Sequence, residues 1–112
     1  MASIRLTKVI EKMKLENLTP ELDIANVKIT QPDINRPALQ LAGYLEHFAT
    51  KRLQVMGFVE YSYMMSMSEE KKKEIYEGII QDDCPGFVFC RELVPDEAFL
   101  AVANRKGVPV LN

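Results

Sequence analysis

Short apolar runs alternate with helical patterns along this chain, and this alternation restricts the fold more than any other feature. Residues 27–30, 53–56 and 87–90 are dominated by β-branched, aromatic or other apolar side chains, which is typical of strands. Segments with helical patterns lie between and after them. Strands that alternate with helices indicate an α/β domain in which helices cover a sheet. We therefore expect residues 1–112 to form a single small layered domain, with a mixed sheet of about four to five short strands.

The last helix has the clearest boundary signals in the sequence. Pro95 suits the first helical position, and the two acidic residues after it complement the positive end of the helix dipole. Two basic residues precede Gly107, which can adopt the left-handed conformation that ends a helix. Residues 109–111 then predict a short extended segment.

Weaker patterns predict the elements of the first half. Residues 7–14 carry an apolar stripe and predict a short helix capped by Thr7. Residues 15–18 predict a short strand. Residues 37–42 predict one or two helical turns that end at Gly43.

Two adjoining segments give signals of unequal strength. Residues 58–67 alternate as a strand does, but their methionines suit a helix, so both structures stay open. Ser66 and Glu69 then form a capping box for a clear helix. The predicted apolar face of that helix consists of Ile75, Tyr76, Ile79 and Ile80.

Composition excludes several classes of partner. With 47% hydrophobic and 27% charged residues, the 112-residue chain has the make-up of an ordinary globular domain. A net charge of -2 provides no general attraction for nucleic acid or for an anionic membrane. No run approaches the roughly eighteen apolar residues that span a bilayer, and the first residues lack the apolar core of a secretory signal. We therefore expect neither a nucleic-acid partner nor a membrane.

The spacing of the glycines excludes the familiar nucleotide-binding loops. The five glycines are Gly43, Gly57, Gly78, Gly86 and Gly107. Neither GxGxxG nor GxxxxGK can be written with them, and both motifs need glycine so that backbone N–H groups can approach phosphate oxygens. We therefore expect no nucleotide cofactor of the kinds that these loops bind in this chain.

Side chains that commonly bind metals are sparse. His47 is the only histidine and lies among apolar residues, so it is interpreted as structural. Cys84 and Cys90 are too few for a zinc site and are interpreted as free thiols of a cytosolic protein, with a disulfide or redox role as the alternative. Asp82 and Asp83 are interpreted as a helix end or turn, and no metal site is expected.

The stretch DINRPALQLAGYLEHF, residues 33–48, holds the candidate binding residues. It combines short polar side chains that favour turns with an arginine, whose rigid fork of donors can grip a carboxylate or phosphate. The candidate ligand-binding set is Asp33, Asn35, Arg36, Tyr44 and Arg52. The alternative is a scaffold role for this stretch, with Arg36 paired to Asp33 or to a backbone carbonyl.

Read as a whole, PDINRPALQLAGYLEHFATKRLQVMGFVEYSYM resembles the N-terminal domain of HPr serine kinase/phosphorylase. That family carries a pattern of the form D-I-S-R-P-G-L-x-L-A-G-Y-F, followed by an R-I-Q-L-L-G-like strand. The matching positions are Asp33, Ile34, Arg36, Pro37, Leu39, Leu41, Ala42, Gly43, Tyr44, Arg52, Gln54 and Gly57. Downstream, QDDCPGFVFCRELVP resembles the family's D-D-T-P-x-I-I-V-T-R-x-L-x-P, so the resemblance covers nearly the whole chain.

The resemblance implies a fold and a parent enzyme. The fold is an α/β domain similar to the uridine-nucleotide-binding domain of the UDP-muramoyl-peptide ligases. The parent enzyme is a cytoplasmic hexamer of bacterial carbon catabolite control. It phosphorylates a serine of HPr, a carrier of the sugar phosphotransferase system, with ATP or pyrophosphate and Mg²⁺, and reverses the modification by phosphorolysis. Its phosphate loop and catalytic residues lie in a C-terminal kinase domain, and none of them matches a position here.

By this resemblance, the chain is a non-catalytic assembly or regulatory domain, which associates with itself or packs on a kinase domain. The alternative is a stand-alone module that senses a nucleotide or phosphorylated metabolite.

Three positions depart from the family pattern: Asn35 replaces Ser, Ala38 replaces Gly and Cys84 replaces Thr. If the family's Ser contacts a ligand, Asn35 changes that contact. If the Ser caps the following turn, Asn serves equally well.

Overall fold

The computed structural model confirms the α/β class. In the residues that it describes, 3–31, 33–46, 48–90 and 92–112, the chain forms five helices and six strands. The helices are α1 (Leu6–Met13), α2 (Ala38–Leu41), α3 (Phe58–Met65), α4 (Glu69–Ile79) and α5 (Glu97–Lys106). The strands are β1 (Ile4–Arg5), β2 (Lys28–Ile29), β3 (Ile34–Asn35), β4 (Leu53–Met56), β5 (Phe87–Phe89) and β6 (Val110–Leu111).

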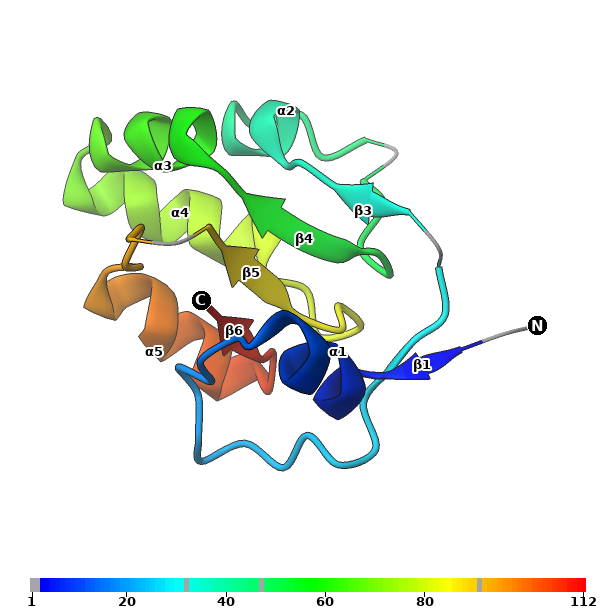
Figure 1. The fold of residues 1–112 in the computed structure, drawn as a ribbon. Coiled ribbons are helices and arrows are strands. Elements are labelled where there is room, and N and C mark those ends of the chain that lie inside the picture. Colours follow the sequence, from blue (N-terminus) through cyan, green and yellow to red (C-terminus); the bar gives the residue numbers. More distant parts are fainter. Residues whose placement is uncertain (1–2, 32, 47, 91) are drawn as a thin grey trace.

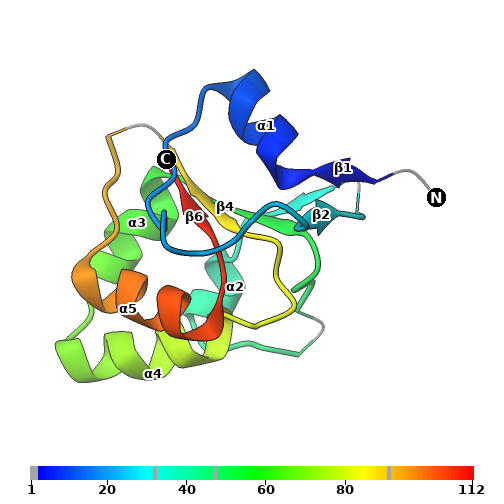
Figure 2. The ribbon, with the colours of Figure 1, turned by 90° about the horizontal axis from the view of Figure 1, so that it is seen from below.

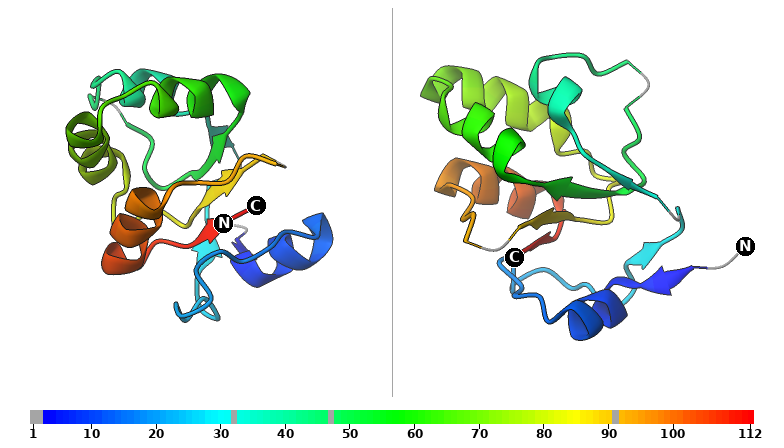
Figure 3. Two further views of the ribbon diagram at one scale, coloured as in Figure 1. Left: turned by 90° about the vertical axis from the view of Figure 1, so that its left-hand side faces the viewer. Right: turned by 45° about the horizontal axis from the view of Figure 1, so that its top comes forward.

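The central sheet consists of β3, β4, β5 and β6, which pair in chain order and run parallel. Right-handed crossovers that always step in the same direction place their helices on one face of a sheet. Figure 1 and Figure 3 accordingly show α2 to α5 on one face and α1 on the other. Because the strand order never reverses in this sheet, it lacks the switch point at which open α/β sheets usually form a ligand crevice.

The pleat of the sheet divides its side chains between two cores. On β5, Phe87 and Phe89 face the core beneath the helices, whereas Val88 faces the core beneath α1. Leu111 of β6 joins Leu6 of α1 in this second core. The sheet is therefore covered on both faces, as parallel sheets normally are.

Aromatic side chains fill the larger core. The ring of Phe99 on α5 meets those of Tyr76, Phe87 and Phe89 edge-on, with centroid distances of 5.1, 5.3 and 5.0 Å. Edge-to-face contacts of this kind add stability beyond the burial of area. They fix α4 and α5 against the middle of the sheet.

A smaller unit carries the N-terminal residues. Strands β1 and β2 pair antiparallel, with Ile4 opposite Ile29, and Figure 2 shows them together with α1 at one side of the molecule. The strand expected at residues 27–30 is confirmed as β2, although it belongs to this unit and not to the central sheet. Strand β1 was not anticipated from the sequence pattern, because two residues are too few to show alternation.

The strand expected at residues 15–18 is reduced to a single antiparallel bridge between Asn17 and Leu111. The backbone of this segment nevertheless follows β6, since the Leu18 N–H donates to the Val110 carbonyl at 2.8 Å. The segment thereby covers the outer edge of β6, which would otherwise expose unpaired backbone groups. The antiparallel bridge at Asn17 thus adds to the parallel sheet of β3 to β6.

The structure resolves the ambiguous segment and corrects one helix start. The segment that begins at Phe58 is helical as α3, and Ser66 ends this helix instead of capping the next one. The cap of α4 is Ser68, whose hydroxyl oxygen accepts the Lys71 N–H at 3.2 Å. The sequence signal was misplaced by two residues because both serines precede acidic residues.

Two other caps differ from expectation in the same small way. Asp96 is the N-cap of α5 and accepts the Phe99 N–H at 3.0 Å, so Pro95 lies just outside the helix. Helix α1 starts at Leu6, after Arg5, and Thr7 does not cap it. The expected left-handed Gly107 is confirmed, with a φ of 74°.

Candidate functional site

Arg36 and Glu60 form a two-pronged ion pair at the carboxyl end of the sheet. Arg36 directly follows β3, and Glu60 lies in the first turn of α3, which follows β4. The Arg36 Nε atom donates to Glu60 Oε2 at 3.0 Å, and Nη2 donates to Oε1 at 2.8 Å. The Glu60 side chain is 4% exposed and that of Arg36 is 51% exposed. The expected pairing of Arg36 with Asp33 or a backbone carbonyl is therefore wrong, because its partner is this buried carboxylate.

Glu60 also closes the N-terminus of α3. Its Oε1 atom accepts the backbone N–H of Gly57 at 3.0 Å, which is the glutamate half of a capping box, since glycine has no side chain to supply the other half. The positive end of the helix dipole favours a carboxylate at this position. Gly57 leaves room for the guanidinium, because a Cβ atom there would overlap Arg36 Nη2 and force it to move.

Burial and hydrogen bonding act in opposite directions on the pKa of Glu60. Burial raises this pKa, whereas hydrogen bonds from Arg36 and from the backbone lower it, and the net result is a pKa below the usual value. The pKa of Arg36 is raised, chiefly by its hydrogen bond to Glu60. Both shifts favour the charged forms, so Arg36 already holds an anion that belongs to the protein.

The side chain of Asn35 bonds across to β4. Its Nδ2 atom donates to Gln54 Oε1 at 2.7 Å. Gln54 is fully buried, and its Nε2 atom donates to the carbonyls of Ala49 and Arg52, both at 2.9 Å. The buried amide thus has partners at both ends, as buried polar groups require. Asn35 connects two strands and does not cap the following turn.

The remaining candidate residues make separate contacts. Asp33 Oδ2 and Arg52 Nη2 lie 4.0 Å apart in a solvent-exposed pair, which contributes little to stability. Tyr44 lies beyond the end of α2, with its side chain largely exposed. Of the five candidates, the structure therefore brings Asp33 and Arg52 together, whereas Asn35 and Arg36 bond to Gln54 and Glu60.

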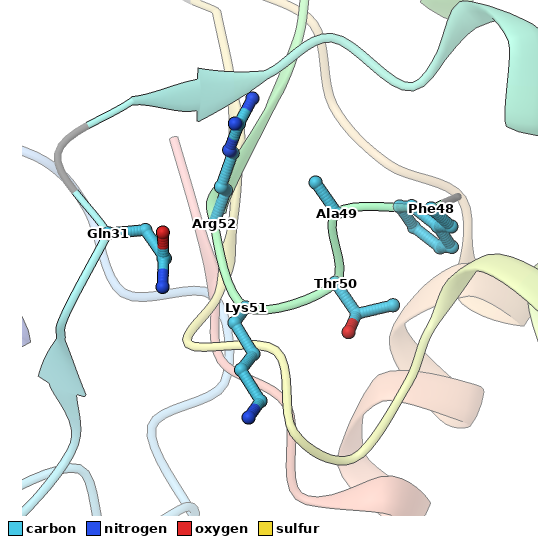
Figure 4. A pocket seen from close by; sticks show the side chains of 6 residues that line it. All are labelled: Gln31, Phe48, Ala49, Thr50, Lys51 and Arg52. Carbon is cyan, nitrogen blue, oxygen red and sulfur yellow. The ribbon is translucent and has the colours of Figure 1, made fainter.

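A hollow of about 370 Å³ lies beside Arg52 (Figure 4). It is lined by Gln31, Phe48, Ala49, Thr50, Lys51 and Arg52. In Figure 4 the side chain of Arg52 extends toward β3, whereas that of Lys51 points away from it. The Thr50 hydroxyl donates to Asp83 Oδ2 at 3.0 Å. Of the five predicted residues, only Arg52 lines this hollow.

Side chains of the protein itself make polar contacts at the carboxyl end of the sheet. Open α/β sheets bind their ligands at this end. Beside β3 and β4 the space is taken by Arg36 and Glu60. Beside β5 and β6 lies Asn112, whose Nδ2 atom is 3.1 to 3.4 Å from three carbonyl oxygens that share its two N–H donors. These carbonyls belong to Phe89, Cys90 and Leu93.

Other reactive or metal-binding groups are few. In the part of the chain that the structure describes, no group of three or more His, Cys, Asp or Glu side chains could hold a metal ion. His47 lies outside the described residues, so its structural role stays a prediction. Cys84 is buried, which raises the pKa of its thiol to about 12, and Cys90 is exposed. No helix among the described residues is long and apolar enough to cross a membrane.

Comparison with known proteins assigns the family. The sequence model of the HPr Serine kinase N terminus matches residues 4–112. The chain belongs to this family. An HPr kinase/phosphorylase of Lachnoclostridium phytofermentans is 44% identical over 98% of this chain and 36% of its own length. The proteins of that name from Shouchella clausii and Bacillus subtilis are 35% and 32% identical over 99% of this chain, again over 36% of their own lengths. The chain thus spans about a third of the relatives that it matches.

In this member of the HPr serine kinase N-terminal family, residues of the DINR motif make contacts that hold parts of the domain together. Arg36 of the DINR segment lies against Gly57, which directly follows β4, and Asn35 donates a hydrogen bond to Gln54 of that strand. Sequence reasoning missed Glu60, which holds these elements together. The available signal was a glycine followed three residues later by a glutamate, the spacing of a capping box.

Proposed function

We propose that this chain is a non-catalytic N-terminal domain of an HPr kinase/phosphorylase and serves the assembly or regulation of the longer enzyme. The family match over residues 4–112 supports the parent. We further propose that the kinase domain of the longer, cytoplasmic enzyme lies outside this chain. That domain would bind HPr, ATP or pyrophosphate, and Mg²⁺.

One observation supports the non-catalytic role above the others. The carboxyl end of the sheet, where an α/β domain would hold a substrate, is occupied by the Arg36–Glu60 ion pair and by the side chain of Asn112. Displacing Arg36 would leave the buried Glu60 carboxylate without its main partner, and displacing Asn112 would break its bonds to nearby carbonyls. The polar side chains at this end of the domain therefore stabilise the fold.

Transfer of phosphate to HPr tests the proposal. We expect the purified chain to leave HPr unmodified with ATP and Mg²⁺, under conditions in which the Lachnoclostridium relative phosphorylates it. A chimera in which this chain replaces the matching third of that relative should keep both kinase activity and the relative's oligomeric state. Phosphorylation of HPr by this chain alone, or a chimera that assembles no better than the truncated relative, would overturn the proposal.

The hollow beside Arg52 favours a second candidate function, the sensing of a small phosphorylated molecule. Lys51 and Arg52 give its rim two cations. A ligand at about 100 times its Kd should stabilise the chain by about 2.7 kcal/mol. Thermal melts with nucleotides, sugar phosphates and inorganic phosphate, repeated on Arg52→Gln, measure this effect. Equal melting temperatures with and without every compound would remove the sensing role.

A further inference from the structure

Basic side chains gather on the N-terminal unit formed by β1, α1 and β2. Residues 3–14 and 27–30 contain five of the chain's fourteen basic residues and one of its sixteen acidic residues. These segments therefore carry a net charge of +4, and the rest of the chain carries -6. The small net charge of the whole chain conceals this division. A local excess of one sign attracts partners of the opposite sign even when the total charge is low.

Helix α1 turns its charged face away from the domain. Leu6 is fully buried, and Val9 and Ile10 pack in the same core beneath the helix. Lys8 and Lys12 are exposed and lie one turn apart, so they share the outer face of α1. Figure 3 shows α1 on the outside of the sheet face that α2 to α5 do not cover. The outer face of α1 is therefore accessible to a partner.

Two further cations lie side by side on the strand pair next to α1 (Figure 2). Arg5 of β1 and Lys28 of β2 are directly opposite each other in the antiparallel register, and both are exposed. Like charges in this arrangement destabilise a strand pair. Binding of an anion between them removes that cost.

A hollow of about 490 Å³ connects the strand to the helix. Arg5 and Lys8 border this hollow, and Ile4, which is 40% exposed, adds apolar surface to it. The complete lining is Ser3, Ile4, Arg5, Thr7, Lys8 and Glu11. The basic surface is defined here by Arg5, Lys8, Lys12 and Lys28. It thus combines four cations with a recess that has an apolar wall.

The cations of the basic surface have no acidic partner in the part of the chain that the structure describes. None of the four takes part in an ion pair there, and Glu11, which borders the same hollow, pairs with none of them. Six basic side chains of the other elements and loops do pair with acids: Arg36, Arg52, Lys71, Lys72, Arg105 and Lys106. The basic surface is therefore the region where positive charge is left for an external partner.

We propose that the basic surface docks an extended acidic segment of another protein, in which Asp and Glu residues alternate with apolar ones. The carboxylates of this segment pair with the four cations, and one of its apolar side chains enters the hollow beside Ile4. The inference goes beyond the proposed function, because it assigns a binding partner that neither assembly nor phosphate transfer requires.

Nucleic acid and an anionic membrane fit this surface less well. A nucleic-acid strand carries a charge at every nucleotide, which brings phosphates close to Glu11, and residues 1–31 contain no aromatic side chain on which a base could stack. A membrane takes up the apolar face of an amphipathic helix, but that face of α1 already packs within the domain. A peptide can space its carboxylates so that an apolar residue lies beside Glu11.

Fluorescence anisotropy with a labelled peptide tests the inference. The probe is a peptide in which Asp and Glu alternate with Leu, and its control has Asn and Gln in place of the acids. We expect the acidic peptide to bind with a Kd on the order of 100 µM in about 50 mM salt and several-fold more weakly in about 500 mM salt. No binding of the acidic peptide up to about 1 mM, or equal binding of the amide peptide, would refute the inference.

Variants that remove charge locate the binding. Lys8→Gln combined with Lys12→Gln should weaken binding of the acidic peptide about tenfold, because two exposed ion pairs are lost. The matched control is Lys71→Gln combined with Lys73→Gln, which removes the same charge from exposed positions of α4 and should bind within about twofold of the wild type. Circular dichroism establishes that each variant is folded. Equal affinities of the two variants would contradict a site on α1.

Single-stranded RNA and vesicles that contain phosphatidylserine complete the test. Both should bind more weakly than the acidic peptide at the same salt concentration. Tighter binding of either one would replace the acidic segment as the occupant and so overturn the inference. None of these measurements depends on HPr, so the proposed function is tested separately by the phosphorylation assay and the chimera.

Discussion

Arg36 and Glu60 lie 24 positions apart in the sequence and are joined by two parallel hydrogen bonds, with the carboxylate buried and the guanidinium half-exposed. The pair connects the end of β3 to the start of α3, and Glu60 caps that helix at the same time. Charge-assisted, bidentate bonds of this type are the strongest hydrogen bonds in proteins. Arg36 of the DINR motif, which suggested a ligand loop, therefore fixes the segment after β3 against the start of α3.

Removing the guanidinium should destabilise the fold. Arg36→Ala leaves the Glu60 carboxylate buried without its main partner. Loss of one member of a buried pair costs about 3–5 kcal/mol. Because Arg36 is half-exposed and water can replace part of its contact, we expect about 2 kcal/mol, measured by urea unfolding at neutral pH. Arg52→Ala is the matched control, and its exposed pair at 4.0 Å should contribute less than about 0.5 kcal/mol.

The same variant should change how stability depends on pH. In the wild type the folded-state pKa of Glu60 lies below its unfolded value near 4.5, so its stabilisation is present above that pH and is lost on acidification. In Arg36→Ala, burial without the guanidinium raises the pKa of Glu60, and the folded state gains stability as this carboxyl is protonated. The difference in unfolding free energy between the two proteins should therefore shrink from about pH 7 to about pH 4. A constant difference would contradict this account of the pair.

Gly57 should be coupled to Arg36 because the two occupy the same space. In Gly57→Ala the new methyl group overlaps Arg36 Nη2 and must push the guanidinium off Glu60. The φ of -92° at Gly57 is open to any residue, so the backbone adds no strain. We expect a cost of about 1–2 kcal/mol alone and only a few tenths in the Arg36→Ala background. Equal costs in both backgrounds, measured by a double-mutant cycle, would mean that the two sites are independent.

Local signals predicted the elements of this domain better than they predicted its polar contacts. The apolar run at β5 and the left-handed glycine after α5 depend on neighbouring residues, and both are confirmed. The contacts of Arg36 with Glu60 and of Asn35 with Gln54 join segments 24 and 19 positions apart. No periodicity specifies such partners, because they are set by which strand ends the fold brings together.

The same limit explains the misassigned strand at residues 15–18. Its apolar residues do pack toward the sheet, but only Asn17 meets the bridge geometry with Leu111. The sequence pattern recorded burial of the segment correctly. The pattern could not show that the partner strand, β6, has only two residues with which this segment can pair.

The two cysteines should differ in reactivity. Burial raises the pKa of Cys84 to about 12, so its reactive thiolate is scarce at ordinary pH, whereas Cys90 is exposed to reagent. Iodoacetamide near pH 8 should modify Cys90 alone in the folded chain, and both thiols after denaturation in urea. Peptide mass spectrometry identifies the labelled residue. Rapid labelling of Cys84 in the folded chain would show that its surroundings open readily.

Gly107 isolates the contribution of backbone conformation to stability. It ends α5 with a φ of 74°, and its N–H donates to the Asn104 carbonyl at 3.2 Å. A Cβ atom at this position would meet nothing within 4 Å, so Gly107→Ala changes no packing. The cost should come from the left-handed conformation alone, about 1 kcal/mol. Gly107→Asn should cost less, because asparagine tolerates this conformation better than alanine does. Urea unfolding of both variants measures the order, and an alanine variant as stable as the wild type would show that the turn relaxes to another conformation.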